Sequence, residues 1–203
     1  MIDRFVAWLL SFGLKLLTGA HGRWSGCAPV PIQRIYCVNH TSHLDFLLLW
    51  TALPGRMRRL TRPVAAADYW NAGAIRHYII HRVFHGVLVD RSGKSPNPLE
   101  PVFDAIAEGH SLIFFPEGTR GPGEALLPFK SGIYHVARHS PNVDLVPVWI
   151  DNSYRVMPKG MFFPIPLLCS MSFGVPLRLS EQEDKETFLA RLRQAMLELQ
   201  PPQ

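Results

Sequence analysis

The sequence predicts a single α/β domain, a sandwich of helices around a largely parallel or mixed sheet, with an amphipathic membrane-interface helix at its N-terminus. Short apolar runs typical of buried strands alternate with helical stretches along the whole chain. The 203 residues are 47% hydrophobic, which is enough for one well-buried domain. The sequence contains no internal repeat or domain linker. We therefore expect an interfacial helix over residues 1–20 and one folded domain over residues 21–203.

The N-terminal helix is predicted from residues 5–17, which are apolar apart from Ser11 and Lys15 and too few to span a bilayer. Together with Arg4 and Thr18, these two residues recur at helical spacing and form one polar stripe. A polar stripe on an apolar helix is typical of a helix lying in the membrane interface, and we expect the stripe to face water. A helix buried against the domain and a signal peptide are the alternatives.

Charge and cysteine content narrow the class of protein. The formal net charge is +5, so we expect an anionic partner: a phospholipid surface, a phosphate-bearing substrate or a nucleic acid. Three cysteines show no paired spacing, which indicates reduced thiols in a cytoplasmic compartment.

The first polar cluster with chemical potential is residues 39–45, between a predicted strand over 33–38 and a predicted helix over 43–53. If Asp45 holds one imidazole nitrogen of His40, the other nitrogen is left to take a proton from a hydroxyl. The alternative is structural, because Ser42 and Asp45 also have the spacing of a capping box.

The middle of the chain continues the alternation. A basic run over residues 55–62 is predicted to be a loop, followed by a strand over 64–67 and one helix over 69–84. Three histidines recur every four residues there, but no acid or cysteine completes a set of ligands, so we expect no metal site. These histidines are His77, His81 and His85.

Two further strands are predicted to end in charged residues. Residues 86–91 form a strand that ends at Arg91, and residues 111–115 form one that runs into Pro-Glu-Gly-Thr-Arg at 116–120. A glycine lets the backbone approach a ligand, and an arginine binds phosphate through two hydrogen bonds, so the second segment indicates an anion site. A plain turn with a surface pair between Glu117 and Arg120 is the alternative.

The C-terminal part supplies four more predicted elements: helices over residues 99–108 and 129–139, a strand over 144–150 and a last strand over 170–177. Pro147 favours an edge or irregular position for the strand over residues 144–150.

Two further features lie near the C-terminus. Residues 161–168 are strongly apolar and belong either to the core or to a surface that contacts membrane or acyl chains. Ser180 and Glu183 have the spacing of a capping box for a final helix over residues 181–199.

The ordered set of motifs resembles that of the glycerolipid acyltransferase family. The segment His-Thr-Ser-His-Leu-Asp at 40–45 resembles its His-x4-Asp motif, and residues 86–91, 115–120 and 146–148 resemble its second, third and fourth motifs. With Phe-Lys-Ser-Gly at 129–132, the resemblance covers roughly residues 33–150.

The resemblance implies that His40 is the general base and Asp45 its orienting partner. A hydroxyl of an acceptor lipid would then attack an acyl thioester carried by coenzyme A or acyl carrier protein, with no covalent acyl-enzyme and no further cofactor. It also implies that a set of residues after the second and third motifs binds the acceptor: Arg91, Glu117, Gly118, Thr119, Arg120 and, as a helper, Lys130.

The expected reaction makes phosphatidic acid from 1-acyl-glycerol-3-phosphate, in phospholipid biosynthesis at the cytoplasmic face of the cell membrane. Glycerol 3-phosphate or a lyso-aminolipid are alternative acceptors, and a non-catalytic lipid-binding protein is the alternative from another class. A serine hydrolase is disfavoured because the chain has no Gly-x-Ser-x-Gly elbow. Charge is the one feature that favours a nucleic acid, so we expect no nucleic-acid partner.

Overall fold

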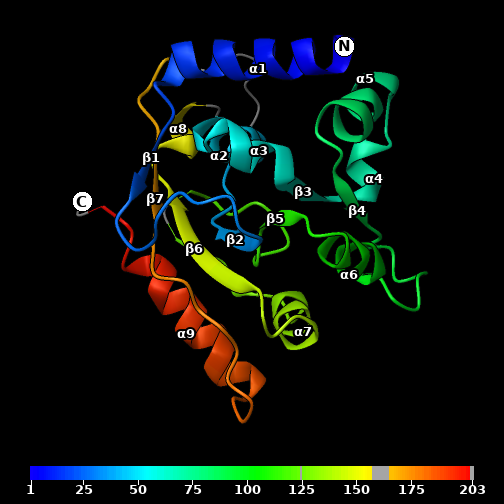
Figure 1. Cartoon of the computed structure of the whole chain (residues 1–203), viewed down its shortest axis with the longest axis vertical. Helices are drawn as coiled ribbons and strands as arrows, with labels where there is room; N and C mark the ends of the chain where they lie inside the picture. Colours follow the sequence, from blue (N-terminus) through cyan, green and yellow to red (C-terminus); the bar gives the residue numbers. More distant parts are fainter. Residues whose placement is uncertain (124, 157–164, 202–203) are drawn as a thin grey trace.

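The computed structural model describes residues 1–123, 125–156 and 165–201, and its centre is a seven-stranded sheet (Figure 1). The strands lie across the sheet in the order β1 (His21–Trp24), β7 (Ser170–Phe173), β6 (Asp144–Ile150), β2 (Arg34–Val38), β5 (Ser111–Phe114), β3 (Thr61–Ala66) and β4 (Val87–Val89). The five neighbouring strands from β6 to β4 are parallel, β7 is antiparallel to β6, and β1 is parallel to β7. The mixed α/β fold predicted from the sequence is therefore confirmed.

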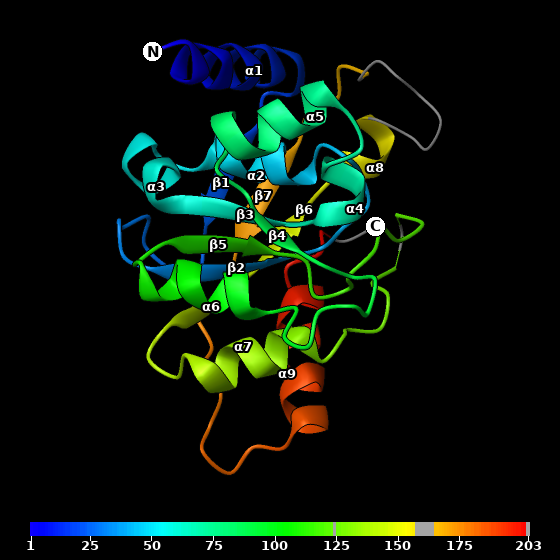
Figure 2. The same cartoon turned by 90° about the vertical axis from the view of Figure 1, so that its right-hand side faces the viewer.

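Helices cover both faces of the sheet and give a three-layer sandwich (Figure 2). One face carries α1 (Ile2–Thr18), α2 (Asp45–Ala52), α3 (Gly55–Leu60), α5 (Ala74–Tyr78) and the π-helix η1 (Ile79–Val83). The other face carries α6 (Glu100–Ala107), α7 (Gly132–His139) and α9 (Lys185–Leu197). The two short helices α4 (Ala67–Trp70) and α8 (Ser153–Val156) follow strand ends.

The central strand β2 is buried along its whole length, because helices pack on both of its faces. Tyr36 and Val38 point into the core beneath α1 and α2, whereas Ile35 and Cys37 point into the core beneath α6 and α7. Strand β2 pairs with β5 on one side and β6 on the other. Its C-terminal end is therefore held firmly where the polar cluster begins.

Of the two positions predicted for Pro147, at a sheet edge or at an irregular point of a strand, the structure shows the second. Strand β6 lies inside the sheet between β7 and β2. The segment that pairs with β6 on the β7 side contains a β-bulge. Leu145 pairs with Leu177 and Val148 pairs with Phe173, so an advance of three residues along β6 corresponds to four residues along the opposite segment. Because Pro147 sits at this β-bulge, its missing N–H leaves no ladder hydrogen bond unmade.

Two local predictions were wrong. The basic run at 55–62, predicted to be a loop, forms helix α3 before β3 begins at Thr61. The helix predicted over 69–84 is divided into α4, α5 and η1, with Gly73 at φ 139° between the first two. A residue with a side chain is strained in that conformation, so the helix cannot continue through position 73.

Helix α1 packs on the domain, and its polar stripe is divided: Arg4 and Lys15 are exposed as predicted, whereas Ser11 and Thr18 are buried. The residues that face the domain are Ala7, Ser11, Leu14 and Thr18. The two hydroxyls are satisfied inside the helix, because Ser11 donates to the Ala7 carbonyl oxygen at 2.8 Å and Thr18 to that of Leu14 at 2.7 Å. Large apolar side chains cover the outer face instead, namely Phe5, Trp8, Leu9, Phe12 and Leu16.

None of the helices in residues 1–123, 125–156 and 165–201 is long and apolar enough to cross a bilayer. Of the apolar stretch predicted at 161–168, residues 161–164 lie outside the described residues, and Ile165, Leu167 and Leu168 are exposed.

The final helix begins later than predicted, and its cap gives the first testable prediction. Asp184, not Ser180, accepts hydrogen bonds from the amides of Glu186 and Thr187 at 2.9 and 3.0 Å. Asp184→Ala should therefore lower the free energy of unfolding by about 1 kcal/mol, measured by urea denaturation. Ser180→Ala is the matched control and should change stability by less than about 0.5 kcal/mol. A larger loss from Ser180→Ala than from Asp184→Ala would contradict the assigned cap.

Candidate active site

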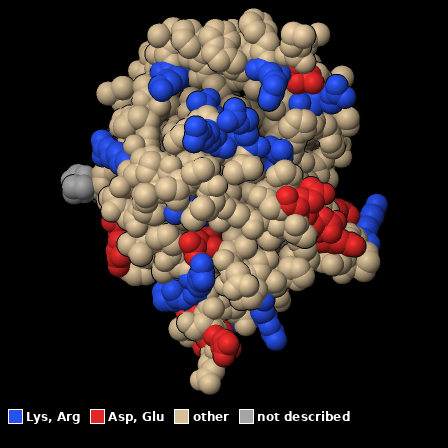
Figure 3. All heavy atoms as spheres, in the orientation of Figure 1, with Lys and Arg blue, Asp and Glu red and all other residues tan. Residues whose placement is uncertain are grey.

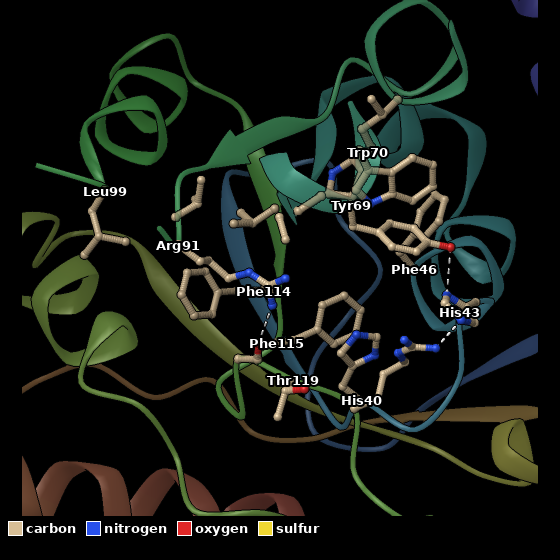
Figure 4. A pocket seen from close by; sticks show the side chains of 18 residues that line it. His40, His43, Phe46, Tyr69, Trp70, Arg91, Leu99, Phe114, Phe115 and Thr119 are labelled. Atoms are coloured by element: carbon tan, nitrogen blue, oxygen red, sulfur yellow. Dashed lines mark hydrogen bonds between the residues drawn. The ribbon is translucent and has the colours of Figure 1, made fainter. Parts of the chain in front are cut away.

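Polar residues from four parallel strands meet at the carboxyl edge of the sheet, the usual ligand position in such folds. Strand β2 leads into His40, β4 into Arg91 and β5 into residues 115–120, while β3 leads into α4 and Tyr69. Together they line a cavity of about 260 Å³ (Figure 4).

The His40 imidazole is held by a buried carboxylate. Its Nδ1 lies 2.9 Å from Oδ2 of Asp45, and the Asp45 side chain is fully buried. A carboxylate accepts, so Nδ1 carries the proton and donates it in this hydrogen bond. The other nitrogen, Nε2, is then the basic one, and His40 lines the cavity.

Asp45 also closes the loop that carries His40. The same Oδ2 accepts hydrogen bonds from the amides of Thr41 and Ser42, at 2.6 and 2.8 Å. Both contacts predicted for Asp45, with the His40 ring and with backbone amides, are present, and one oxygen makes them all. Three donors therefore converge on that oxygen.

Further contacts fix the backbone and ring of His40. Its carbonyl oxygen accepts from the amide of Gly121 at 2.7 Å, and its ring stacks on Phe115 with centroids 4.1 Å apart. The preceding Asn39 is buried and exchanges two hydrogen bonds with the backbone of Ile150, at 3.0 and 2.7 Å. The end of β2 is thereby fixed to the end of β6. Sequence reasoning gave no role to Asn39 or Phe115, although Asn39 directly precedes the first motif and Phe115 is the first residue of the third.

Glu117 lies behind the cavity wall. It is 1% exposed, and its carboxylate accepts from the amide of His40 at 2.7 Å and from the amide of Leu127 at 2.8 Å. Burial raises the pKa of Glu117, and the two amide hydrogen bonds oppose this. Both oxygens are therefore committed to backbone donors. In the structure both oxygens of Glu117 support the backbone, including that of the loop that carries His40.

Arg91 lies on the cavity wall in a defined orientation. Its guanidinium donates to both carboxylate oxygens of Asp68, at 3.0 to 3.3 Å, and to the carbonyl oxygen of Gly118 at 3.2 Å. Gly118 has φ 68°, where a glycine is favoured, and its neighbour Thr119 lines the cavity too. The structure thus brings these three predicted residues to one wall.

Arg120, which belongs to the third motif, also lines the cavity, whereas Lys130 does not. The Arg120 guanidinium contacts Nε2 of His43, whose Nδ1 lies 3.1 Å from the hydroxyl of Tyr69. Lys130 is exposed and is absent from the residues that line the cavity. Its amide donates to the carbonyl oxygen of Pro116 at 2.8 Å, which closes the third-motif turn.

The remaining wall of the cavity is apolar. It is built from side chains of β3, β5, α2, α4 and η1: Phe46, Val64, Tyr69, Trp70, Ile80 and Phe114. Phe46 packs edge-on against both Trp70 and Phe84, with centroids 5.6 and 5.2 Å apart. Such a wall suits an aliphatic chain. Sequence reasoning assigned none of these residues, because nothing in the local pattern separates cavity lining from core.

The arrangement combines a base with anion-binding groups beside an apolar wall. An imidazole with one nitrogen held by a buried carboxylate is able to remove a proton from a hydroxyl. Two guanidinium groups bind phosphate well. Among the described residues, no three or more His, Cys, Asp and Glu side chains gather closely enough to hold a metal ion.

Comparison with known proteins gives the family. Residues 29–151 match the family model described as Acyltransferase, which is more than half of the 203 residues. The chain therefore belongs to the acyltransferase family, and the resemblance predicted from its four motifs is confirmed.

Named relatives agree with this assignment. The 1-acyl-sn-glycerol-3-phosphate acyltransferase of Limnanthes douglasii is 25% identical over 188 residues, covering 89% of this chain and 60% of that protein. The alpha form from Homo sapiens is 30% identical over 156 residues, covering 72% of this chain and 51% of that protein. The chain thus spans between half and two thirds of the length of these relatives.

One solved structure shares the fold. The crystal structure of the 1-acyl-sn-glycerophosphate (LPA) acyltransferase PlsC from Thermotoga maritima aligns with a TM-score of 0.71 at 20% identity. The alignment covers 97% of this chain and 79% of that one.

The role of Glu117 gives the second prediction. In Glu117→Gln one carboxylate oxygen becomes an NH₂ group, which faces a backbone N–H. We expect the free energy of unfolding to fall by about 1–3 kcal/mol, the range for a buried donor left without its acceptor. The matched control is Glu100→Gln, on an exposed site of α6, which should stay within about 0.5 kcal/mol of the parent. Equal urea midpoints for the two variants would remove Glu117 from its supporting role.

Proposed function

We propose that the protein transfers a fatty acyl group from an acyl thioester to the hydroxyl of 1-acyl-glycerol-3-phosphate and so forms phosphatidic acid. The observation that carries this proposal is the His40–Asp45 pair, which opens on a cavity that also contains Arg91 and Arg120. The names of the relatives favour this acceptor over glycerol 3-phosphate or a lyso-aminolipid.

The reaction needs one base in this account. The acceptor hydroxyl gives its proton to Nε2 of His40 while its oxygen forms a bond to the thioester carbonyl carbon. The tetrahedral intermediate then breaks its carbon–sulfur bond, and the thiolate takes the proton back from the imidazolium. The buried Asp45 carboxylate stabilises the imidazolium formed between these steps.

The two arginines explain a preference for a phosphate-bearing acceptor. The ion pair between Arg91 and Asp68 is about half-exposed on the arginine side and more exposed on the aspartate side, so it contributes little stability and a phosphate displaces Asp68 readily. Arg120 contacts an imidazole and keeps its charge for the phosphate. The apolar wall around Phe46 and Trp70 takes an acyl chain.

The donor is an acyl thioester of coenzyme A or of acyl carrier protein. Its thiol is a weakly basic leaving group, so no second catalytic acid or metal is required of the protein.

We further propose that the exposed face of α1 rests on the cytoplasmic leaflet of the membrane that contains the acceptor. Its outer side chains, named above, form a continuous apolar surface, and the exposed Leu168 lies against Gly19 at its end. Figure 3 shows basic side chains gathered just below α1 on the face drawn. Helix α3 supplies the exposed Arg56 and Arg59. Apolar insertion and basic attraction together favour an anionic membrane surface.

Helix α1 is fixed next to the cavity, which supports direct delivery of a lipid. Asp3 of α1 accepts a hydrogen bond from Tyr78 at 2.8 Å and pairs with Arg82 at 3.5 Å. These partners flank Ile80, which lines the cavity. A membrane in contact with the outer face of α1 would therefore lie close to the apolar cavity wall.

The proposed reaction is tested by product mass. Purified protein is given 1-acyl-glycerol-3-phosphate with acyl-coenzyme A or acyl carrier protein, and phosphatidic acid is expected with at least one donor. His40→Ala should lower kcat by about 10² to 10⁴-fold, the usual cost of losing a general base, and Asp45→Ala should also lower it strongly. The control His139→Ala, on α7 across the sheet, should retain the parent rate. Near-parent turnover by His40→Ala would refute this assignment of the base.

Membrane attachment is tested on the outer face of α1 alone, because Ala7 and Leu14 belong to the core and deletion of the helix would disturb folding. The triple variant Phe5→Ser, Trp8→Ser and Phe12→Ser should sediment less with anionic phospholipid vesicles. Activity should fall on vesicle substrate far more than on detergent-dispersed substrate.

A matched control removes exposed apolar side chains elsewhere, with Ile32→Ser and Val175→Ser. These variants should bind vesicles as the parent does. Unchanged sedimentation of the α1 variant would show that the membrane contact lies on another surface.

A further inference from the structure

His43 contacts a proposed phosphate-binding residue, although it is not the motif base. It precedes α2, which begins at Asp45, and its side chain lies on the cavity wall. Its Nε2 contacts the guanidinium of Arg120, and its Nδ1 lies 3.1 Å from the Tyr69 hydroxyl (Figure 4). The His43 and Tyr69 rings also stack with centroids 5.3 Å apart. One imidazole thus joins residues from three separate segments.

The chemistry of the partners fixes the protonation of this imidazole. A guanidinium offers only donors, so the His43 nitrogen that faces Arg120 has to be the unprotonated acceptor. A neutral imidazole then carries its proton on Nδ1, which donates to the Tyr69 hydroxyl. Arg76 fixes Tyr69 in turn, with its guanidinium carbon 4.4 Å from the centroid of the tyrosine ring.

An imidazole partner affects an arginine side chain differently from a carboxylate partner. Asp68 orients Arg91 but cancels part of its charge, and a phosphate has to displace it. The neutral His43 orients Arg120 without cancelling its charge. Arg120 therefore remains a full cation in a fixed direction, which lowers the cost of ordering the side chain when an anion binds.

We propose that His43 is a positioning residue for the acceptor phosphate: its neutral imidazole, held by Tyr69, aims the Arg120 guanidinium into the cavity. This inference rests on the proposed function for the identity of the anion, a phosphate monoester carried by a lipid. It assigns His43 an effect on acceptor affinity, separate from the proton transfer carried out by His40.

The arrangement also makes acceptor binding sensitive to pH. Partial desolvation and the nearby Arg120 lower the pKa of His43, with smaller effects in the same direction from His40 and Arg76 and an opposing effect from Asp45. The contact is therefore complete above this lowered pKa. As the pH falls through it, His43 becomes a cation and a donor, repels Arg120 and releases it.

The test measures binding of 1-acyl-glycerol-3-phosphate in detergent micelles by calorimetry, without donor. It uses His40→Ala as the parent protein, so that the second imidazole neither titrates nor supports turnover. Adding His43→Ala should weaken binding by about 3- to 10-fold at pH 8, as expected for the loss of one hydrogen bond. Adding His43→Gln should restore parent affinity, because the glutamine oxygen accepts from Arg120 and its NH₂ donates to Tyr69.

Three controls isolate this effect. Binding of a monoacylglycerol, which lacks the phosphate, should be the same for all variants. His139→Gln, on the opposite face, should bind as the parent does. Between pH 8 and pH 5, the affinity of the parent should fall relative to that of His43→Gln. Protonation of the ligand phosphate affects both proteins equally, so it does not change the ratio of their dissociation constants.

The outcomes separate the inference from the proposed reaction. Parent-like binding by His43→Ala, equal weakening by His43→Ala and His43→Gln, or a pH-independent ratio would overturn the role of His43. Acyl transfer is measured in parallel on the protein with His40 intact. A dependence of binding on His43 without any acyl transfer would support the positioning role and overturn the reaction. Failure of the parent to bind the phosphate lipid would overturn both.

Discussion

The site depends on one buried carboxylate oxygen. Oδ2 of Asp45 accepts from the His40 ring and from the amides of Thr41 and Ser42, so it sets the imidazole tautomer and the loop conformation together. The other oxygen, Oδ1, is buried and has no hydrogen-bond partner among the described residues. All of the hydrogen bonds of the Asp45 side chain are thus made by a single oxygen. A small change at Asp45 is expected to affect the direction of the base and the fold of its loop at once.

The sheet supplies the second constraint. Parallel strands place their carboxyl ends on one edge, so residues that lie 75 or more positions apart in the chain meet there. His40 and Glu117 are joined by a 2.7 Å hydrogen bond across two neighbouring strands, β2 and β5. Asn39 joins the end of β2 to β6 on its other side. The loop that carries His40 is therefore fixed from both neighbouring strands, which limits the motion of the imidazole.

Sequence reasoning located the motif residues but not the direction of every side chain. The strand-to-helix boundary at His40 was predictable because an apolar run, a polar cluster and another apolar run follow one another. The burial of Glu117 was not, because one of its partner amides belongs to His40, 77 positions away in the chain. The orientation of α1 depends on the surface beneath it: Ser11 and Thr18 bond to their own helix and therefore pack on the domain. Periodicity finds a polar stripe but does not say which medium it faces.

The central claim is that Asp45 holds His40 with its proton on Nδ1 and leaves Nε2 as the base. Nitrogen-15 NMR of the histidine rings tests this directly at a pH where His40 is neutral. The account predicts a protonated Nδ1 and an unprotonated Nε2 in the parent, and loss of this fixed tautomer in Asp45→Ala. A neutral His40 that carries its proton on Nε2 would contradict the account, because that nitrogen would have no lone pair for the acceptor hydroxyl.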